Sequence, residues 1–173
     1  NRAIQCVVED TFGRKVWDRF VRDAGSEILD FEALLTYGEE LTSQVIEAAA
    51  SHLSRDRSSL LEDLGSYLVT HQNMDSVRRL LRFGGHTFED FLQSLDDLHD
   101  RVKLAVPDLE LPFLTLEQQS EESYTVSCRY PEPGYGAVLL GMLRALADDY
   151  GVLVLLDLED AHDGEADFEL LKV

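Results

Sequence analysis

The sequence is poor in cysteine and long apolar runs, and each shortage excludes a class of protein. Two cysteines among 173 residues, Cys6 and Cys128, cannot form a disulfide framework or a zinc site built on cysteine pairs. No apolar run reaches the roughly 18 residues that a membrane-spanning helix needs, and the first residues show no signal-peptide pattern. We therefore expect a cytoplasmic protein that does not contact a membrane.

Positive charge is also scarce. The chain has 15 lysines and arginines against 34 aspartates and glutamates, which gives a net charge of −19. Such a chain repels phosphate backbones, so we expect no binding to nucleic acid. The plainest interpretation of the charge is a solvated acidic surface.

Helical patterns fill the first two thirds of the chain and strand patterns fill the rest. Apolar spacings of three and four residues predict helices, and strict alternation predicts strands. The expected helices cover residues 4–12, 16–21, 42–49, 58–71 (with a capping serine at its start), 74–83, 88–102 and 136–150, and the expected strands cover 113–116, 123–130, 152–156 and 168–173. Pro107 and Pro112 mark the change. This order predicts an α+β fold, in which a helical subdomain precedes a small antiparallel sheet with one inserted helix.

One histidine lies where a buried helix face would carry an apolar residue. Across residues 88–102 the apolar positions are Phe88, Leu92, Leu95, Leu98 and Val102, and His99 shares their face. A buried imidazole needs a partner, because an unsatisfied buried polar group costs roughly 1–3 kcal/mol. Either a neighbouring group satisfies the ring, which is the commoner case, or a ligand binds there.

A strand with polar residues on one face is the second candidate. From Tyr124 onward, the period of two places Thr125, Ser127 and Arg129 on one side and apolar residues on the other. A half-exposed strand with its polar side in water explains this pattern. A clamp for a carboxylate or phosphate explains it as well, because guanidinium offers a planar fork of donors.

Several segments together resemble one family. They are NRAIQCVVEDTFGRKVW at the start, FLQSLDDLHDRVKLAVPDLELPF around His99, VSCR in the strand, and GAVLLGMLRALADDYG after it. The chain resembles the H-NOX family, the haem-based nitric oxide and oxygen sensing domains related to soluble guanylate cyclase. The resemblance implies a single domain over 1–173, with a distal helical subdomain over about 1–60. Residues from about 61 to 173 would supply the helices and sheet that anchor haem between the two parts.

The resemblance also implies a haem b cofactor and a role for particular residues. His99 corresponds to the proximal iron ligand, and Pro112 to the proline that presses on the porphyrin. Thr125, Ser127 and Arg129 correspond to the Tyr-x-Ser-x-Arg motif that holds the haem propionates. Thr125 departs from the motif, since the family has tyrosine there. The nearest tyrosine comes one residue earlier, on the opposite face of a regular strand.

The expected gas ligand follows from the positions that align with the distal pocket. These are Ile4, Leu68 and Val138, which are all apolar, so bound oxygen would find no donor there and nitric oxide is the expected ligand. Tyr135 lies near this region and would change that preference if it turned inward. Nitric oxide would loosen the bond between His99 and iron, and the two subdomains would then rotate slightly. A partner enzyme, such as a histidine kinase or a cyclic-dinucleotide enzyme, would read this change.

Two other functions are also consistent with the sequence. A domain that has lost haem could serve as a protein-interaction or dimerisation module, with Thr125 marking decay of the haem site. An enzyme using His86 or His99 with Glu89 and Asp90 is a third possibility, but histidine–carboxylate neighbours on a helix are common as solvated pairs. We find no phosphate loop, nucleophile elbow or paired-histidine motif, so we expect no catalytic activity.

Overall fold

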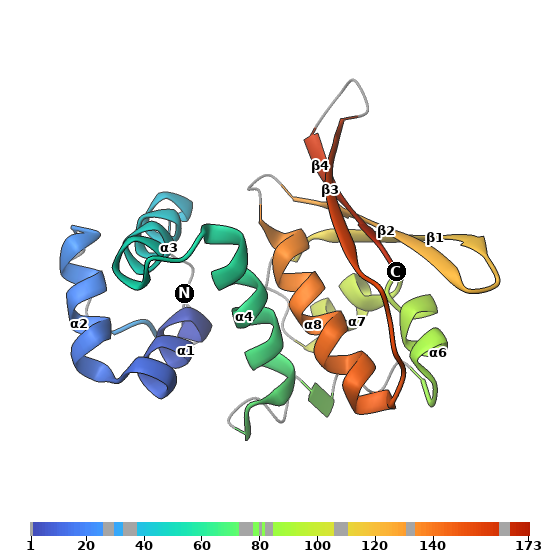
Figure 1. Ribbon diagram of the computed structural model, residues 1–173, viewed down its shortest axis with the longest axis horizontal. Helices are drawn as coiled ribbons and strands as arrows, with labels where there is room; N and C mark the ends of the chain where they lie inside the picture. The colour runs from blue at the N-terminus through green and yellow to red at the C-terminus, as the bar shows by residue number, and fades with distance from the viewer. Residues whose placement is uncertain are drawn as a thin grey trace.

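The structure is a computed structural model that describes residues 2–25, 30–32, 38–72, 78–79, 81, 85–105, 111–130, 134–162 and 167–173. In chain order its elements are α1 (Arg2–Phe12), α2 (Arg14–Asp23), α3 (Glu39–Leu53), α4 (Arg57–Thr70), α6 (Phe88–Gln93), α7 (Leu98–Ala105), β1 (Phe113–Ser120), β2 (Ser123–Arg129), α8 (Tyr135–Tyr150), β3 (Asp157–His162) and β4 (Asp167–Lys172). Figure 1 shows α1–α3 at one end, α4 and α8 side by side in the middle, and the sheet at the other end. The α+β prediction is confirmed. Among these residues no helix is long and apolar enough to cross a membrane.

The sheet is antiparallel throughout, with strand order β1-β2-β4-β3. The chain leaves the sheet after β2, forms α8, and returns as β3, so α8 is the inserted helix that the sequence predicts. One face of the sheet contributes Tyr124, Val126 and Leu171 to the main core, where they pack with α8, α6 and α7. The other face carries Thr125, Ser127 and Arg129, which are half-buried.

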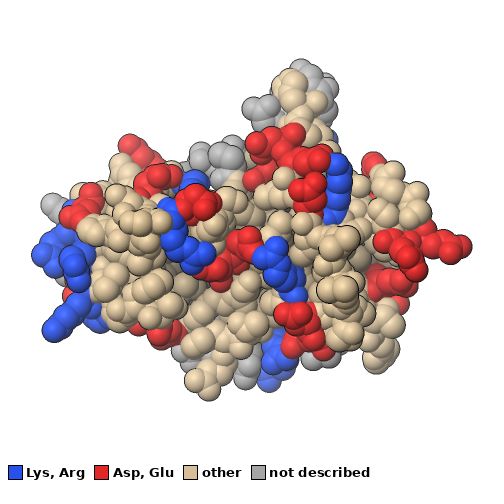
Figure 2. Space-filling model, in the orientation of Figure 1, with Lys and Arg blue, Asp and Glu red and all other residues tan. Residues whose placement is uncertain are grey.

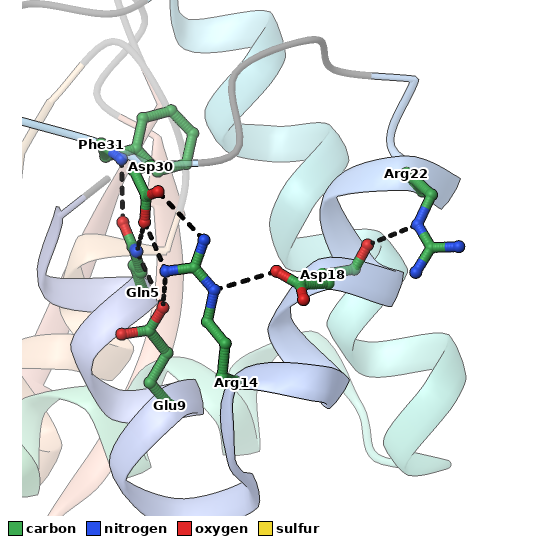
Figure 3. Close-up of polar contacts among 7 residues, drawn as sticks. All are labelled: Gln5, Glu9, Arg14, Asp18, Arg22, Asp30 and Phe31. Carbon is green, nitrogen blue, oxygen red and sulfur yellow. Dashed lines mark hydrogen bonds and ion pairs between the residues drawn. The ribbon is translucent and has the colours of Figure 1, made fainter.

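The N-terminal helices have a core of their own, built around Trp17, Phe20 and Val45. Residues 30–31, which come after α2, are anchored to helix α1 by a polar network (Figure 3). The buried Gln5 amide donates to the Asp30 carboxylate at 2.7 Å and accepts the Phe31 backbone N–H at 2.8 Å. The Arg14 guanidinium binds the same Asp30 carboxylate and, together with Gln5, holds its pKa below the ordinary range.

Helices α4 and α8 approach so closely that they require glycine at two positions. A Cβ atom added at Gly65 would lie 1.9 Å from the Val138 carbonyl oxygen, and one added at Gly141 would lie 1.9 Å from the Glu62 carbonyl oxygen. The Ser66 hydroxyl completes the contact by donating to the Gly141 carbonyl at 3.2 Å. The two helices therefore form one rigid unit between the N-terminal helices and the sheet.

The helix expected over 88–102 is wrong as a single element, because the chain turns between α6 and α7. Thr87 and Asp90 form a capping box that starts α6, and Ser94 ends it by donating from its hydroxyl to the Phe91 carbonyl at 2.7 Å. The Asp96 carboxylate in the turn accepts the Leu116 backbone N–H of β1 at 2.7 Å. The predicted apolar face is nevertheless correct, since all five of its apolar residues lie in the main core.

Two other predictions from the sequence differ from the structure, and a third lies mostly outside the residues that it describes. Residues 152–156 are not a strand, because the β3–β4 ladder begins only at Asp157, opposite Lys172. The residue that caps α4 is Asp56, whose carboxylate accepts the Ser59 N–H at 2.8 Å, and not a serine. The helix expected over 74–83 falls mostly outside the described residues, as does Pro107.

Candidate functional site

His99 is the second residue of α7; the residue is half-buried, but both of its ring nitrogens are buried without a polar partner. Each ring nitrogen, Nδ1 and Nε2, has less than 1 Å² of exposed surface and no hydrogen-bond partner. The ring stacks on Phe113 at the start of β1, with ring centroids 4.4 Å apart and planes inclined by 22°. Within the described part of the chain, the only other buried side-chain nitrogen or oxygen that lacks a partner is Nε of Arg101.

Leaving both nitrogens of His99 unsatisfied is costly, since each such group costs roughly 1–3 kcal/mol. A neutral imidazole also has one lone pair that suits a metal ion. The described residues contain no group of three or more histidine, cysteine, aspartate or glutamate side chains that could hold a bare metal ion. A single histidine suffices for haem, because the porphyrin supplies the equatorial ligands of the iron. The donor set at His99 therefore fits haem better than a metal ion alone.

The polar face of β2 lies on the same side of the sheet as Phe113. Phe113 pairs with Arg129 across the β1–β2 ladder, and Thr115 pairs with Ser127. The guanidinium carbon of Arg129 lies 3.9 Å from the centre of the Phe168 ring. Phe113 thus contacts His99 through its ring and neighbours Arg129 through the strand, so the structure brings the candidate ligand and the candidate anion clamp to one corner of the sheet.

Pro112 comes just before β1, and Thr125 lies near the start of β2, so the two residues are at opposite ends of the β1–β2 pair. Pro112 immediately precedes Phe113 and is half-buried. Thr125 faces Glu117 across the ladder, two positions along β2 from Ser127. Tyr124 points into the core with 5% of its surface exposed, and the irregularity in the β1–β2 register next to it, between Gln118 and Ser120, does not turn its side chain to the polar face. Tyr124 therefore does not replace the tyrosine that Thr125 lacks.

The three residues expected on the distal side separate into two positions. Ile4 and Val138 pack in one apolar cluster around Leu61 of α4, where α1, α4 and α8 meet. Leu68 is half-buried on α4 and is not a member of that cluster. Tyr135 lies against Tyr130, with ring centroids 4.3 Å apart.

A pocket of about 300 Å³ opens between α1, α3 and α4, and Ile4 is part of its lining. Its wall is mostly apolar but includes Tyr67, whose hydroxyl donates to the Asp10 carboxylate at 2.5 Å. The Tyr67 ring also stacks on His71. Sequence reasoning missed both Tyr67 and Phe113 as site residues. Phe113 could have been found, because it follows Pro112 and heads a predicted strand.

Neither cysteine is suited to nucleophilic chemistry. Burial, with a smaller contribution from the Glu169 carboxylate, raises the pKa of the Cys128 thiol to about 12. Burial also raises the pKa of Cys6. Both thiols are therefore neutral near pH 7 and act as packing groups.

Comparison with known families shows which family the chain belongs to. The family model described as Haem-NO-binding (HNOB) matches residues 1–155. The chain belongs to the haem-NO-binding family. Members of this family are haem-based gas-sensor domains related to soluble guanylate cyclase, so the H-NOX resemblance of the sequence is confirmed.

Solved H-NOX structures share the fold of this domain. The Fe(II) unliganded H-NOX protein from K. algicida superposes with a TM-score of 0.82 at 19% identity, covering 98% of this chain and 91% of that one. An H-NOX protein from S. oneidensis in the Fe(II)NO ligation state gives a TM-score of 0.76 at 15% identity, covering 100% and 98%. At such identities the likeness shows the fold alone.

Sequence relatives of this H-NOX domain include much longer proteins. Soluble guanylate cyclase gcy-31 of Caenorhabditis elegans is 24% identical over 164 residues, which cover 92% of this chain and 23% of the relative. Soluble guanylate cyclase 89Da of Drosophila melanogaster is 20% identical over 148 residues, which cover 86% and 22%. The chain thus spans about a quarter of the length of these relatives.

Proposed function

We propose that this H-NOX domain binds haem b through His99 and senses nitric oxide. The observation that carries the proposal is the enclosed imidazole of His99, whose two nitrogens lack a protein partner. An iron ligand would satisfy one nitrogen and account for an arrangement that is otherwise unfavourable. In this proposal residues 1–60 form the distal part, and residues 61–173 anchor the cofactor.

The polar face of β2 would hold the haem propionates. Arg129 supplies a cation and Ser127 a hydroxyl donor, and both are half-buried beside Phe113. Two carboxylates brought into a chain of net charge −19 need such a local cation. Thr125 offers a third, shorter donor, and Pro112 would contact the porphyrin next to the ligand.

The apolar distal residues favour nitric oxide over oxygen. Haem held by His99 would supply the iron that binds a diatomic gas. Ile4, Leu68 and Val138 offer no hydrogen-bond donor to such a gas, and the Tyr67 hydroxyl already donates to Asp10. Oxygen depends on a donor for stable binding, whereas nitric oxide does not.

The signal would leave through α7 and β1. His99 contacts β1 through Phe113, and the turn before α7 is bonded to the same strand through Asp96. Arg101 ties α7 to the turn by donating to the Ser94 carbonyl at 2.9 Å. A change in the force on His99 would therefore reach both the turn and the sheet. A partner enzyme in the cytoplasm, such as a histidine kinase or a cyclic-dinucleotide enzyme, would read this change. The names of the relatives suggest a guanylate cyclase as a third candidate.

Reconstitution with reduced haem tests the proposal. We expect the wild-type chain to take up haem saturably with a Soret band that shifts when nitric oxide is added. His99→Ala should weaken uptake by at least about tenfold, which corresponds to about 1.4 kcal/mol. The matched control is His86→Ala, since this exposed histidine lies two residues before α6, outside the site, and its loss should leave uptake unchanged.

A haem-free interaction module is the second candidate, and the threonine at position 125 favours it. In that case His99 would be a half-buried residue that tolerates its unsatisfied ring nitrogens, held by its stack on Phe113. No saturable haem uptake by the wild type, with His99→Ala folding as stably, would support this module and contradict the sensor.

A further inference from the structure

Helix α2 concentrates positive charge in a chain that is otherwise acidic. Four of the 15 lysines and arginines lie within its ten residues, RKVWDRFVRD, together with only two aspartates, whereas the whole chain has a net charge of −19. Figure 2 shows blue side chains gathered at the end of the molecule where Figure 1 places α2. The helix is therefore a local exception to the acidic surface.

Three of these cations form one stripe along the outer side of α2. Lys15, Arg19 and Arg22 are spaced by four and then three residues, which places them on one helix face over about 10 Å. All three residues are exposed. Trp17 and Phe20 fix the opposite face in the N-terminal core, where they are 0% and 1% exposed, so α2 cannot turn the stripe inward.

Within the described part of the chain, no carboxylate pairs with the stripe. Both aspartates of α2 already have another partner: Asp18 binds the Arg14 guanidinium at 2.9 Å, and Asp23 pairs with His52 of α3. The Arg22 guanidinium donates to the backbone carbonyl of Asp18 at 3.0 Å. Like charges three and four positions apart on a helix repel, so anionic groups that bind the stripe would relieve an unfavourable interaction.

The small size of the stripe decides among anionic partners. A membrane surface or a nucleic-acid duplex is broad, so it would also approach the acidic side chains around the stripe, in a chain with 34 carboxylates. A narrow acidic segment meets mainly the stripe, because charges more than about 8 Å away are largely screened at physiological ionic strength. A helix with carboxylates every three or four residues repeats at the spacing of the three cations.

We infer that Lys15, Arg19 and Arg22 form a docking face for an acidic helix of a partner protein. The two guanidinium groups and the ammonium group bind carboxylates of that helix. Their charge also steers the encounter, which makes association faster at low salt. The face belongs to the N-terminal helices and lies at the end of the molecule opposite the sheet, so the inference does not depend on haem binding.

The probe is a fluorescent, alanine-based helical peptide with glutamates spaced by four and three residues, and its binding to the whole chain is followed by anisotropy. We expect saturable binding that weakens by at least about tenfold in the double variant Lys15→Gln, Arg19→Gln. The matched control is Lys103→Gln, Lys172→Gln, which removes the same charge from exposed residues of α7 and β4. A second peptide of equal composition, with its glutamates spread around the helix, should bind at least about tenfold more weakly.

Several results would overturn the inference. Absence of saturable binding to the wild type would show that the stripe is only solvated. Equal weakening in the two double variants would mean that the peptide responds to net charge alone. Equal binding of the two peptides would exclude recognition of one helix face.

The remaining outcomes concern other occupants. Tighter, stripe-dependent binding to phosphatidylserine vesicles or to duplex DNA than to the peptide would assign the face to a different kind of anion. Self-association of the wild type in sedimentation, lost in the Lys15→Gln, Arg19→Gln variant, would show that the occupant is a second copy. Thermal melting of both double variants checks that the fold is retained, which the exposure of all four side chains predicts.

Discussion

At the scale of single residues, the environment of each side chain decides its role more than its type does. The chain has five histidines, and only His99 among the described side chains has two enclosed ring nitrogens without a partner. His52 is paired with Asp23, and His71 stacks on Tyr67 near Asp10. The periodicity that sets His99 among leucines and valine therefore points to the histidine whose ring nitrogens the structure buries.

Cys128 provides a prediction for pH dependence at the same scale. Its pKa rises from an ordinary 9.0 to about 12 in the folded chain, mainly because the thiol is buried. The unfolded chain thus loses this proton at lower pH than the folded chain does. The resulting stabilisation is complete below pH 9 and is lost as the pH rises from 9 towards 12.

Urea unfolding from neutral to alkaline pH checks this expectation. Replacing Cys128 with alanine should lower stability at neutral pH, because a buried group is removed, but should also flatten the alkaline decline relative to wild type. A variant that declines as steeply as the wild type would contradict the assignment.

At the scale of elements, the close contact between α4 and α8 gives the clearest prediction. Gly65→Ala places a methyl group 1.9 Å from the Val138 carbonyl oxygen, so the helices must separate. We expect the free energy of unfolding, measured by urea denaturation, to fall by about 1–3 kcal/mol. Gly38→Ala is the control, because a Cβ atom there meets nothing within 4 Å, and it should cost little. Equal stability of the two variants would show that the α4–α8 contact is looser than described.

Periodicity identified most elements, and it failed where tertiary contacts override local pattern. The sorting of β2 into polar and apolar faces was predictable because a strand has only one period. The break between α6 and α7 was not predictable from local pattern. It depends on the Ser94 hydroxyl and on the hydrogen bond that the Leu116 N–H of β1 donates to Asp96, and these two residues lie far apart in the sequence. Residues 152–156 have strand periodicity but pair with no strand among the residues that the structure describes, and no pattern within one segment reveals such pairing.

The candidate site was predictable from the sequence only in part. His99 and the polar face of β2 follow from local spacing and from the family resemblance. Their meeting at Phe113 depends on the β1–β2 register, which only the folded sheet fixes. The hydrogen bond between Tyr67 and Asp10 joins α4 to α1 across 57 positions of sequence, beyond the reach of local pattern.

At the scale of the whole molecule, charge sets a cost that salt should relieve. Acidic side chains lie over both ends of the face in Figure 2, and the net charge is −19. Such an excess destabilises the compact state through self-repulsion, and added salt screens it. We expect the urea midpoint to rise from low to high sodium chloride. A fall would mean that ion pairs such as Arg78 with Asp149 contribute more than the repulsion costs.

The central claim is that an enclosed nitrogen of His99 is an iron ligand, and rescue by free imidazole tests it most directly. His99→Gly removes the ring and leaves space for imidazole from solution. We predict that this variant loses its wild-type Soret spectrum with reduced haem and regains it when imidazole is added, while His86→Gly resembles the wild type throughout. A His99→Gly variant that binds haem with the wild-type spectrum before any imidazole is added would contradict the account.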